Sequence, residues 1–226
     1  MIELHDVERT FAVGRRRISA LRGISLQIPR GAFVLLMGPS GSGKTTLLNL
    51  LGGLDRPTAG QVIIDGEDLA GRSEGELAEY RRRIGFIFQS FALLTTASAY
   101  ENVEMGLRIA AGTPRAEWGV RIRRSLAAVG LTSWADHRPY EMSGGQQQRV
   151  AIARALAIRP RLILADEPTG DLDSRTAARV LQLLRSLADH EGCTLVVSSH
   201  DPSALDYATE VYRLRDGQIE ERGALA

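Results

Sequence analysis

The sequence predicts an α/β protein with a parallel central sheet, and three observations carry this prediction. Short, continuous apolar runs occur at 33–37 (FVLLM), 162–167 (LILADE) and 194–200 (TLVVSSH). Such runs are typical of strands buried on both faces, as parallel strands are. Amphipathic helical patterns lie between the runs. A glycine-rich loop joins the first run to a helix.

The first 90 residues predict an antiparallel layer followed by the start of the parallel core. Strands are expected at 2–4 and 24–28, with a hairpin loop over 13–19 (VGRRRIS) between them. A helix at 43–52 follows the glycine loop. The next expected elements are a strand at 61–66 that ends in an Asp-Gly turn, a helix at 74–83 and a strand at 84–89.

The rest of the chain predicts a helical insert and the remainder of the core. Residues 98–158 carry no strong strand pattern, so we expect them to be helical. An amphipathic helix follows the second buried run, with Ser174 as its N-cap, and a hairpin turns at Asp216-Gly217. No linker, repeat or low-complexity tract divides the chain, which predicts a single domain over 1–226.

Composition limits the classes of function. The 226 residues are 44% apolar and 24% charged with a formal net charge of +1, so no general attraction to nucleic acid is expected. The single cysteine, Cys193, is interpreted as a structural thiol in a reducing compartment. No apolar stretch approaches the roughly 20 residues of a membrane span. We therefore expect a cytoplasmic chain that serves a membrane only through a partner.

The loop GPSGSGKT matches the pattern of a phosphate-binding loop. It follows a buried strand and opens a helix, which is the context that the chemistry requires. Glycines let backbone N–H groups turn inward, and the helix dipole favours an anion there. Lys44 is expected to contact the β- and γ-phosphates of ATP, and the Thr45 hydroxyl to bind Mg²⁺. The predicted cradle consists of Gly38, Pro39, Ser40, Gly41, Ser42, Gly43, Lys44, Thr45 and Thr46.

The run LILADE ends in two adjacent carboxylates. Asp166 is expected beside the metal ion. Glu167, the next residue, points elsewhere and suits a general base for the attacking water. The alternative is a solvated rim at the end of a strand.

With these features the chain resembles the nucleotide-binding subunits of ABC transporters over almost its whole length. The resemblance implies a P-loop NTPase (RecA-like) core with an N-terminal antiparallel layer and an inserted helical subdomain. Seven elements occur in the family's order: Phe11, the phosphate loop 38–46, Gln89, the signature 142–146 (MSGGQ), the acidic strand 162–167, GDLD at 170–173, and His200.

The resemblance also explains why one chain carries two anion cradles. In this family the signature faces the ATP held by a partner chain, and two chains close head to tail around two nucleotides. Ser143 is expected to cap a helix whose first N–H groups await an anion. The alternative is an ordinary capped helix. The residues expected to act in trans are Ser143, Gly144, Gly145 and Gln146.

Other roles are implied only by the resemblance. Phe11 would stack on adenine, although a lone aromatic is as often a core residue. Gln89 would contact Mg²⁺ or the attacking water and begin the segment that senses the permease. His200 would hold the γ-phosphate and position the water. Asp173 and its neighbours would lie at the dimer seam.

Several segments look most like the macrolide-exporter and lipoprotein-release (MacB/LolD-like) subgroup, for example GGLDRPTAGQVIIDGEDL. This implies an ATPase that powers a separate membrane permease through ATP-driven dimer closure, at the cytoplasmic face of the plasma (inner) membrane. Four positions depart from the usual pattern. Met142 stands where leucine is usual, and Asp171 where alanine or asparagine is commoner. Ala92 stands where the subgroup usually has asparagine, and Tyr100 where it usually has leucine.

Two other functions remain compatible with the sequence. An ABC-type ATPase acting on nucleic acid would keep the same motifs but should carry coiled-coil arms, zinc cysteines or a basic face. A binding module that senses ATP without hydrolysing it would not need intact Lys44, Glu167 and His200.

Overall fold

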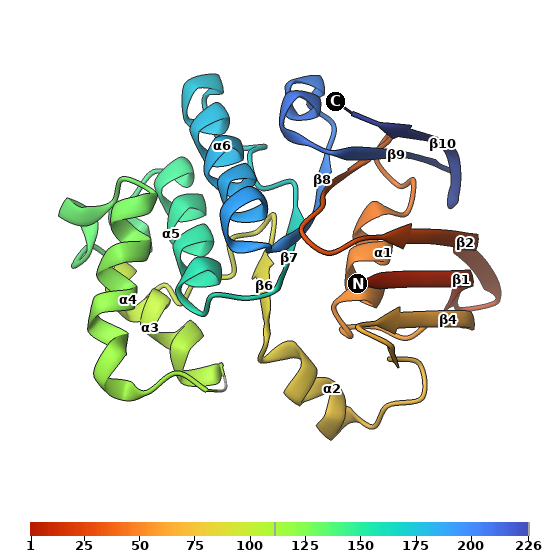
Figure 1. The fold of residues 1–226 in the computed structure, drawn as a ribbon, viewed down its shortest axis with the longest axis horizontal. Helices are drawn as coiled ribbons and strands as arrows, with labels where there is room; N and C mark the ends of the chain where they lie inside the picture. Colours follow the sequence, from red (N-terminus) through yellow and green to blue (C-terminus); the bar gives the residue numbers. More distant parts are fainter. Residues whose placement is uncertain (111, 226) are drawn as a thin grey trace.

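Two sheets and a group of helices make up the protein. The structure is a computed structural model that describes residues 1–110 and 112–225. Figure 1 shows the central sheet between the helices α3 to α5 on one side and an antiparallel sheet on the other, with α1 between the two sheets. No described helix is both long enough and apolar enough to cross a bilayer.

The central sheet has the strand order β10-β9-β3-β8-β7-β6. Its strands run parallel, except that β10 pairs antiparallel with β9 at one edge. The three buried runs of the sequence are its middle strands, as predicted. The bounds are β3 Phe33–Met37, β6 Ile84–Ile87, β7 Leu162–Asp166, β8 Thr194–Ser199, β9 Glu210–Arg215 and β10 Gln218–Ala224.

The antiparallel sheet has the order β2-β1-β4-β5. The hairpin loop predicted over 13–19 was wrong in length, because only the two residues between β1 and β2 form the turn. Phe11 pairs with Ile18 and Val13 with Arg16, so the ladder continues almost to the tip, where Gly14 has a φ of +61°. The strands are β1 Ile2–Val13, β2 Arg16–Ile28, β4 Ala59–Ile64 and β5 Glu67–Asp68.

Strand alternation divides the interior into two cores. Phe33, Leu35 and Met37 face the core under the helices, whereas Val34 and Leu36 face the core shared with α1 and the antiparallel sheet. A continuous apolar run is therefore required, because both faces of β3 are covered.

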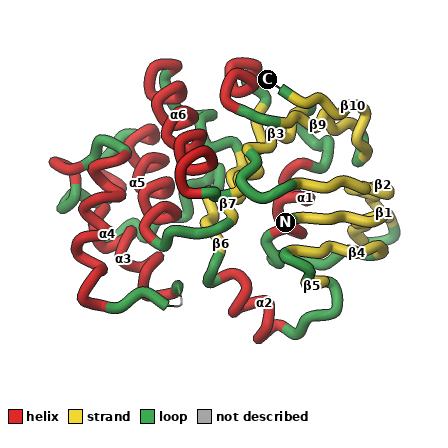
Figure 2. The backbone as a smooth tube through the Cα atoms, viewed as in Figure 1, coloured by secondary structure: helices red, strands yellow, loops and turns green. Residues whose placement is uncertain are grey.

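The insert is helical, as predicted, and Figure 2 shows helices and loops in this part of the chain. Among the described residues of 98–158 there is no strand. The α-helices of the chain are α1 Lys44–Leu51, α2 Glu74–Arg81, α3 Ala99–Ile109, α4 Arg115–Ala128, α5 Gly144–Ala157 and α6 Ser174–Glu191. Short 3₁₀ helices are η1 Thr132–Trp134, η2 Pro139–Glu141 and η3 Pro202–Tyr207.

The predicted cap of α6 was one residue late. Asp173, not Ser174, is the N-cap, and its carboxylate accepts the N–H of Thr176 at 3.0 Å. Ser174 is the first helical residue. Both residue types favour N-caps, so the sequence pattern alone does not distinguish adjacent candidates.

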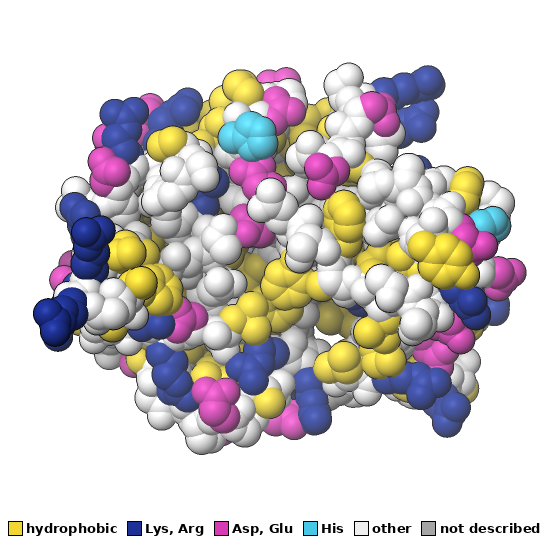
Figure 3. Space-filling model, turned by 180° about the vertical axis from the view of Figure 1, so that it is seen from behind, with side chains coloured by type: hydrophobic (Ala, Val, Ile, Leu, Met, Phe, Trp, Pro, Cys, Tyr) yellow, Lys and Arg dark blue, Asp and Glu magenta, His cyan; other side chains and the backbone are white. Residues whose placement is uncertain are grey.

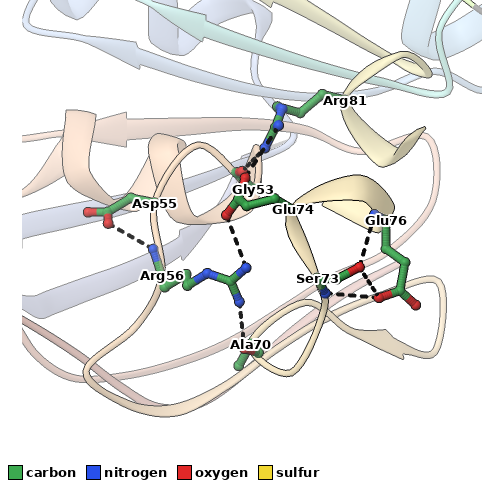
Figure 4. A network of polar contacts seen from close by, with 8 residues as sticks. All are labelled: Gly53, Asp55, Arg56, Ala70, Ser73, Glu74, Glu76 and Arg81. Atoms are coloured by element: carbon green, nitrogen blue, oxygen red, sulfur yellow. Dashed lines mark hydrogen bonds and ion pairs between the residues drawn. The ribbon is translucent and has the colours of Figure 1, made fainter. Parts of the chain in front are cut away.

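Helix α2 is held against the loop that follows α1 (Figure 4). Arg81 donates to the Gly53 carbonyl at 2.6 Å and lies 3.7 Å from Glu74. Arg56 donates to the same Glu74 at 3.0 Å and to the Ala70 carbonyl at 3.2 Å. These contacts fix the helix that leads into β6.

Candidate functional site

A cavity of about 630 Å³ lies at the carboxyl ends of the central parallel strands. β3 leads into the glycine loop, β6 ends just before Gln89, β7 ends at Asp166, and β8 ends just before His200. Ligands of open α/β sheets bind at this edge. The cavity is lined by Ala20, Gly38, Ser40, Gly41, Ser42, Gly43, Lys44, Thr45, Thr46, Gln89, Asp166, Glu167, Gly170, Asp171 and His200.

The glycine loop has the geometry of an anion cradle. A Cβ on Gly38 would lie 2.1 Å from the Leu214 carbonyl oxygen, and one on Gly43 would lie 2.7 Å from that of Ala20. Both glycines also have positive φ angles, so the loop requires them. The backbone N–H groups of Gly41, Gly43, Lys44 and Thr45 donate to no described residue. They are free to bind an anion.

Two side chains of the loop add to this cradle. The Ser42 hydroxyl is buried without a hydrogen-bond partner among the described residues. The Lys44 ammonium, on a side chain that is almost fully buried, donates to the carbonyls of Gly38 at 2.7 Å and Pro39 at 3.2 Å. The positive charge is thus held by the loop itself.

Asp166 lies between a threonine and a serine from other elements. The Thr45 hydroxyl donates to one carboxylate oxygen at 2.8 Å, and the Ser198 hydroxyl donates to the other at 2.5 Å. Ser198 also accepts the N–H of Glu167 at 2.9 Å. One buried hydroxyl on β8 therefore orients both acidic residues at the end of β7.

Glu167 and His200 form the second polar pair of the cavity. His200 Nδ1 lies 2.9 Å from a carboxylate oxygen of Glu167, and the histidine side chain is 72% exposed whereas that of Glu167 is 14% exposed. Glu167 has a φ of +47°, a left-handed conformation that is uncommon for this residue type. In this backbone conformation the carboxylate of Glu167 contacts the histidine.

The signature helix has its own cradle, outside this cavity. Ser143 caps α5 in a capping box with Gln146: its hydroxyl accepts the Gln146 N–H, and the Gln146 side chain accepts the Ser143 N–H. The N–H groups of Gly144 and Gly145 donate to no described residue. Met142 is buried in the core at the position where leucine is usual.

Of the residues predicted from the sequence, the structure brings together the phosphate loop, Gln89, Asp166, Glu167 and His200. Pro39 contributes its carbonyl to Lys44. Phe11 lies outside the lining, 36% exposed on β1, with the Arg9 guanidinium 4.3 Å from its ring centre. The other ring face is not covered by Arg9, and the stacking role stays a prediction.

Sequence reasoning missed Ser198, because a serine inside an apolar strand has no pattern of its own. The adjacent polar pair in TLVVSSH was the only signal. Sequence reasoning also did not place Asp171 in this cavity, where it adds a third carboxylate.

Comparisons with known proteins find a matching family and similar relatives. A family profile described as "ABC transporter" matches residues 21–170. An uncharacterized ABC transporter ATP-binding protein of Thermotoga maritima is 50% identical, over 97% of this chain and 94% of its own. The macrolide export ATP-binding/permease protein MacB of Syntrophobacter fumaroxidans is 49% identical over 100% of this chain. The chain spans only 32% of that MacB protein.

The chain is also similar to a solved structure. The ATP-binding cassette MJ0796 of Methanocaldococcus jannaschii, in a dimeric post-hydrolysis state bound to ADP and Pi, has a TM-score of 0.95 and 43% identity. The alignment covers 100% of this chain and 99% of that one.

Proposed function

The chain belongs to the ABC transporter family of ATP-binding proteins, and from this premise we propose that the cavity at the ends of β3, β7 and β8 binds and hydrolyses Mg·ATP. One observation carries the proposal: three segments far apart in the sequence bring Lys44, Thr45, Asp166, Glu167 and His200 around a single cavity. We treat residues 1–226 as one nucleotide-binding domain with a helical insert.

The residues fit a magnesium ion. Thr45 and Asp166 offer hard oxygen ligands 2.8 Å apart, beside the predicted phosphate cradle. Gln89, which lines the same cavity, is a third oxygen donor. No group of three described His, Cys, Asp or Glu side chains would hold a metal by itself. The phosphates would therefore supply the remaining ligands of the ion. The ion would neutralise negative charge during phosphoryl transfer.

The chain's own residues account for the rest of the chemistry. Lys44 and the free N–H groups of the loop hold the phosphates. Glu167, with most of its side chain buried, accepts the proton of the attacking water. His200 holds the γ-phosphate and positions that water. Water is excluded on the open side by the partner chain.

The partner is a second copy of this chain. The tip of α5, with two unused N–H groups, does not line the chain's own cavity, so it serves an anion held elsewhere. A head-to-tail pair places the Ser143 tip of each chain over the phosphates of the other. The dimeric arrangement of the similar cassette MJ0796 supports this assignment.

A membrane permease is the second partner. An apolar groove of about 540 Å³ runs between β6 and the helical insert, where Phe86, Phe88, Leu94 and Ile109 line it. In Figure 3 hydrophobic side chains border a hollow near the middle of the molecule. Exposed apolar surface of this kind marks an interaction site.

Hydrogen bonds connect the groove to the segment that follows Gln89, a residue of the nucleotide cavity. Arg154 of α5 lines the groove and donates to the carbonyls of Phe91 and Ala92, just after Gln89. Burial lowers the pKa of this guanidinium. We place the chain at the cytoplasmic face of the plasma (inner) membrane, where closing of the dimer drives an export, lipoprotein-release or mechanotransmission permease.

ATP turnover by the purified chain tests the enzymatic part of the proposal. Wild type should hydrolyse ATP in steady state. Glu167→Gln should bind ATP with hydrolysis reduced at least about 100-fold, and Lys44→Ala should lose nucleotide affinity. Equal ATP affinity in Lys44→Ala would contradict the phosphate-binding role of this lysine. An absence of turnover by wild type would contradict hydrolysis and favour a binding module.

A further inference from the structure

A second hollow, of about 460 Å³, lies next to the apolar groove and is rich in arginine. It shares Arg82, Ile84 and Ile158 with the groove, so the two are continuous along one surface. We call it the basic pocket. Its other charged lining residues are Arg83, Arg159, Arg161, Asp65 and Glu67.

The acidic residues of the basic pocket are already paired with arginines outside it. Asp65 lies 2.8 Å from Arg30, and Glu67 lies 2.9 Å from Arg72. They are therefore not available to neutralise the arginines that line the pocket.

The remaining arginines carry uncompensated charge. Arg82 is paired with Glu79 at 2.5 Å. Arg83, Arg159 and Arg161 are exposed and form no ion pair with the side chains that the structure describes. Three like charges around one hollow repel each other, and an anion placed between them relieves that repulsion.

The run Arg81-Arg82-Arg83 has divided roles. Figure 4 shows Arg81 directed to the Gly53 carbonyl and Glu74, where it anchors α2. Arg83 makes no such side-chain contact; it lines the basic pocket and also a smaller hollow beside Glu76 and Glu79. Arg81 therefore anchors the fold, whereas Arg83 does not. The charge of Arg83 is available to a ligand.

We propose that the basic pocket binds an acidic segment of the same permease whose apolar surface occupies the groove. This inference rests on the proposed function. One observation favours a permease segment over an anionic lipid: the pocket continues directly from the groove, so a single segment can reach both. One amphipathic segment would place its apolar side chains in the groove and its Asp or Glu side chains in the pocket.

Site-specific photo-crosslinking in cells that produce the chain tests the inference. A benzophenone amino acid replaces Glu67 at the pocket rim, Ile109 in the groove, or Arg124 on α4 as the control. The crosslinked peptides are identified by mass spectrometry. We expect position 67 to capture an acidic segment of the integral membrane protein that position 109 also captures, and position 124 not to capture it.

The outcomes separate the two proposals. Capture of membrane protein from position 109 with only phospholipid, another protein or nothing from position 67 would overturn the inference and leave the permease partner standing. Capture of no membrane protein from either position would overturn the permease assignment itself.

Charge reversal gives an independent measurement. Arg83→Glu combined with Arg159→Glu should lower the yield of the position-109 crosslink about 10-fold, whereas Arg124→Glu should leave it unchanged. The ATPase rate of the isolated variants should equal that of wild type, because neither arginine lines the ATP cavity. An unchanged crosslink yield in the double variant would contradict the inference.

Discussion

Ser198 has more influence on the site than its position in a buried strand suggests. It has no exposed surface, and its single hydroxyl orients both the residue assigned to the metal ion and the residue assigned to the water. A base that is misplaced by even 1 Å loses much of its efficiency.

We therefore predict that Ser198→Ala lowers kcat about 10-fold or more with little change in ATP affinity. Ser199→Ala is the matched control, because Ser199 is equally buried on the same strand but accepts the N–H of Asp201 instead. Steady-state kinetics and equilibrium nucleotide binding measure the two parameters. Equal kcat values for the two variants would refute the positioning role.

The structure explains why asparagine is usual at position 92, where this chain has alanine. Ala92 has a φ of +48°, directly after Phe91 at +60°. Asparagine tolerates this left-handed conformation better than alanine. The alanine therefore stores strain in the segment that connects Gln89 to the groove.

Ala92→Asn should raise the free energy of unfolding by up to about 1 kcal/mol, measured by urea denaturation. Ala110→Asn is the control, because Ala110 has a φ of −66° and gains nothing from asparagine. A destabilised Ala92→Asn variant would show that the left-handed backbone conformation of Ala92 does not reduce the stability of the protein.

At the scale of elements, the loops whose backbone groups bind ligands could be predicted from the sequence. The exact residues at which helices and strands begin and end could not. The strand 33–37 and the helix after it were located correctly, since a buried run followed by a glycine loop permits little else. The hairpin at 13–19 was not, because polar arginines on an exposed ladder look like a loop. The N-cap of α6 was predicted one residue too late, because the sequence pattern does not distinguish Asp173 from Ser174 as the cap.

The true cap, Asp173, makes the stability of α6 dependent on pH. The hydrogen bond from Thr176 holds the pKa of the Asp173 carboxyl below its ordinary value of 3.8. A lowered pKa in the folded state means that the stabilisation is complete above the ordinary value. It is lost as the pH falls through the lowered value.

Asp173→Ala should accordingly lower the urea midpoint of the nucleotide-free chain at pH 7, and the difference from wild type should shrink as the pH falls below about 4. Asp173→Asn, which can still cap the helix, is the control. A difference between wild type and Asp173→Ala that does not vary with pH would exclude the charged cap as its cause.

At the scale of the whole molecule, the fold holds two anion cradles apart, the glycine loop and the tip of α5. One chain therefore cannot use both cradles on the same nucleotide. The sequence predicted both cradles from local motifs. It did not predict that Asp171 lines the cavity, that Arg154 connects α5 to the segment after Gln89, or that the basic pocket exists. Each of these depends on tertiary contacts between segments that carry no shared pattern.

In the proposed mechanism the chemistry depends on association of two chains. ATP bound to one chain would supply the anion for the α5 tip of the other. Hydrolysis would remove that anion and release the pair, and the groove beside the helical insert would pass the movement to the permease.

The most direct test is the molecular mass of the Glu167→Gln chain in solution with Mg·ATP, measured by light scattering after size exclusion. We predict a dimer with ATP and a monomer without it. Adding Ser143→Arg should abolish the dimer while ATP affinity of the single chain stays unchanged. A double variant that dimerises as well as Glu167→Gln, or a Glu167→Gln chain that stays monomeric at saturating ATP, would contradict the shared site.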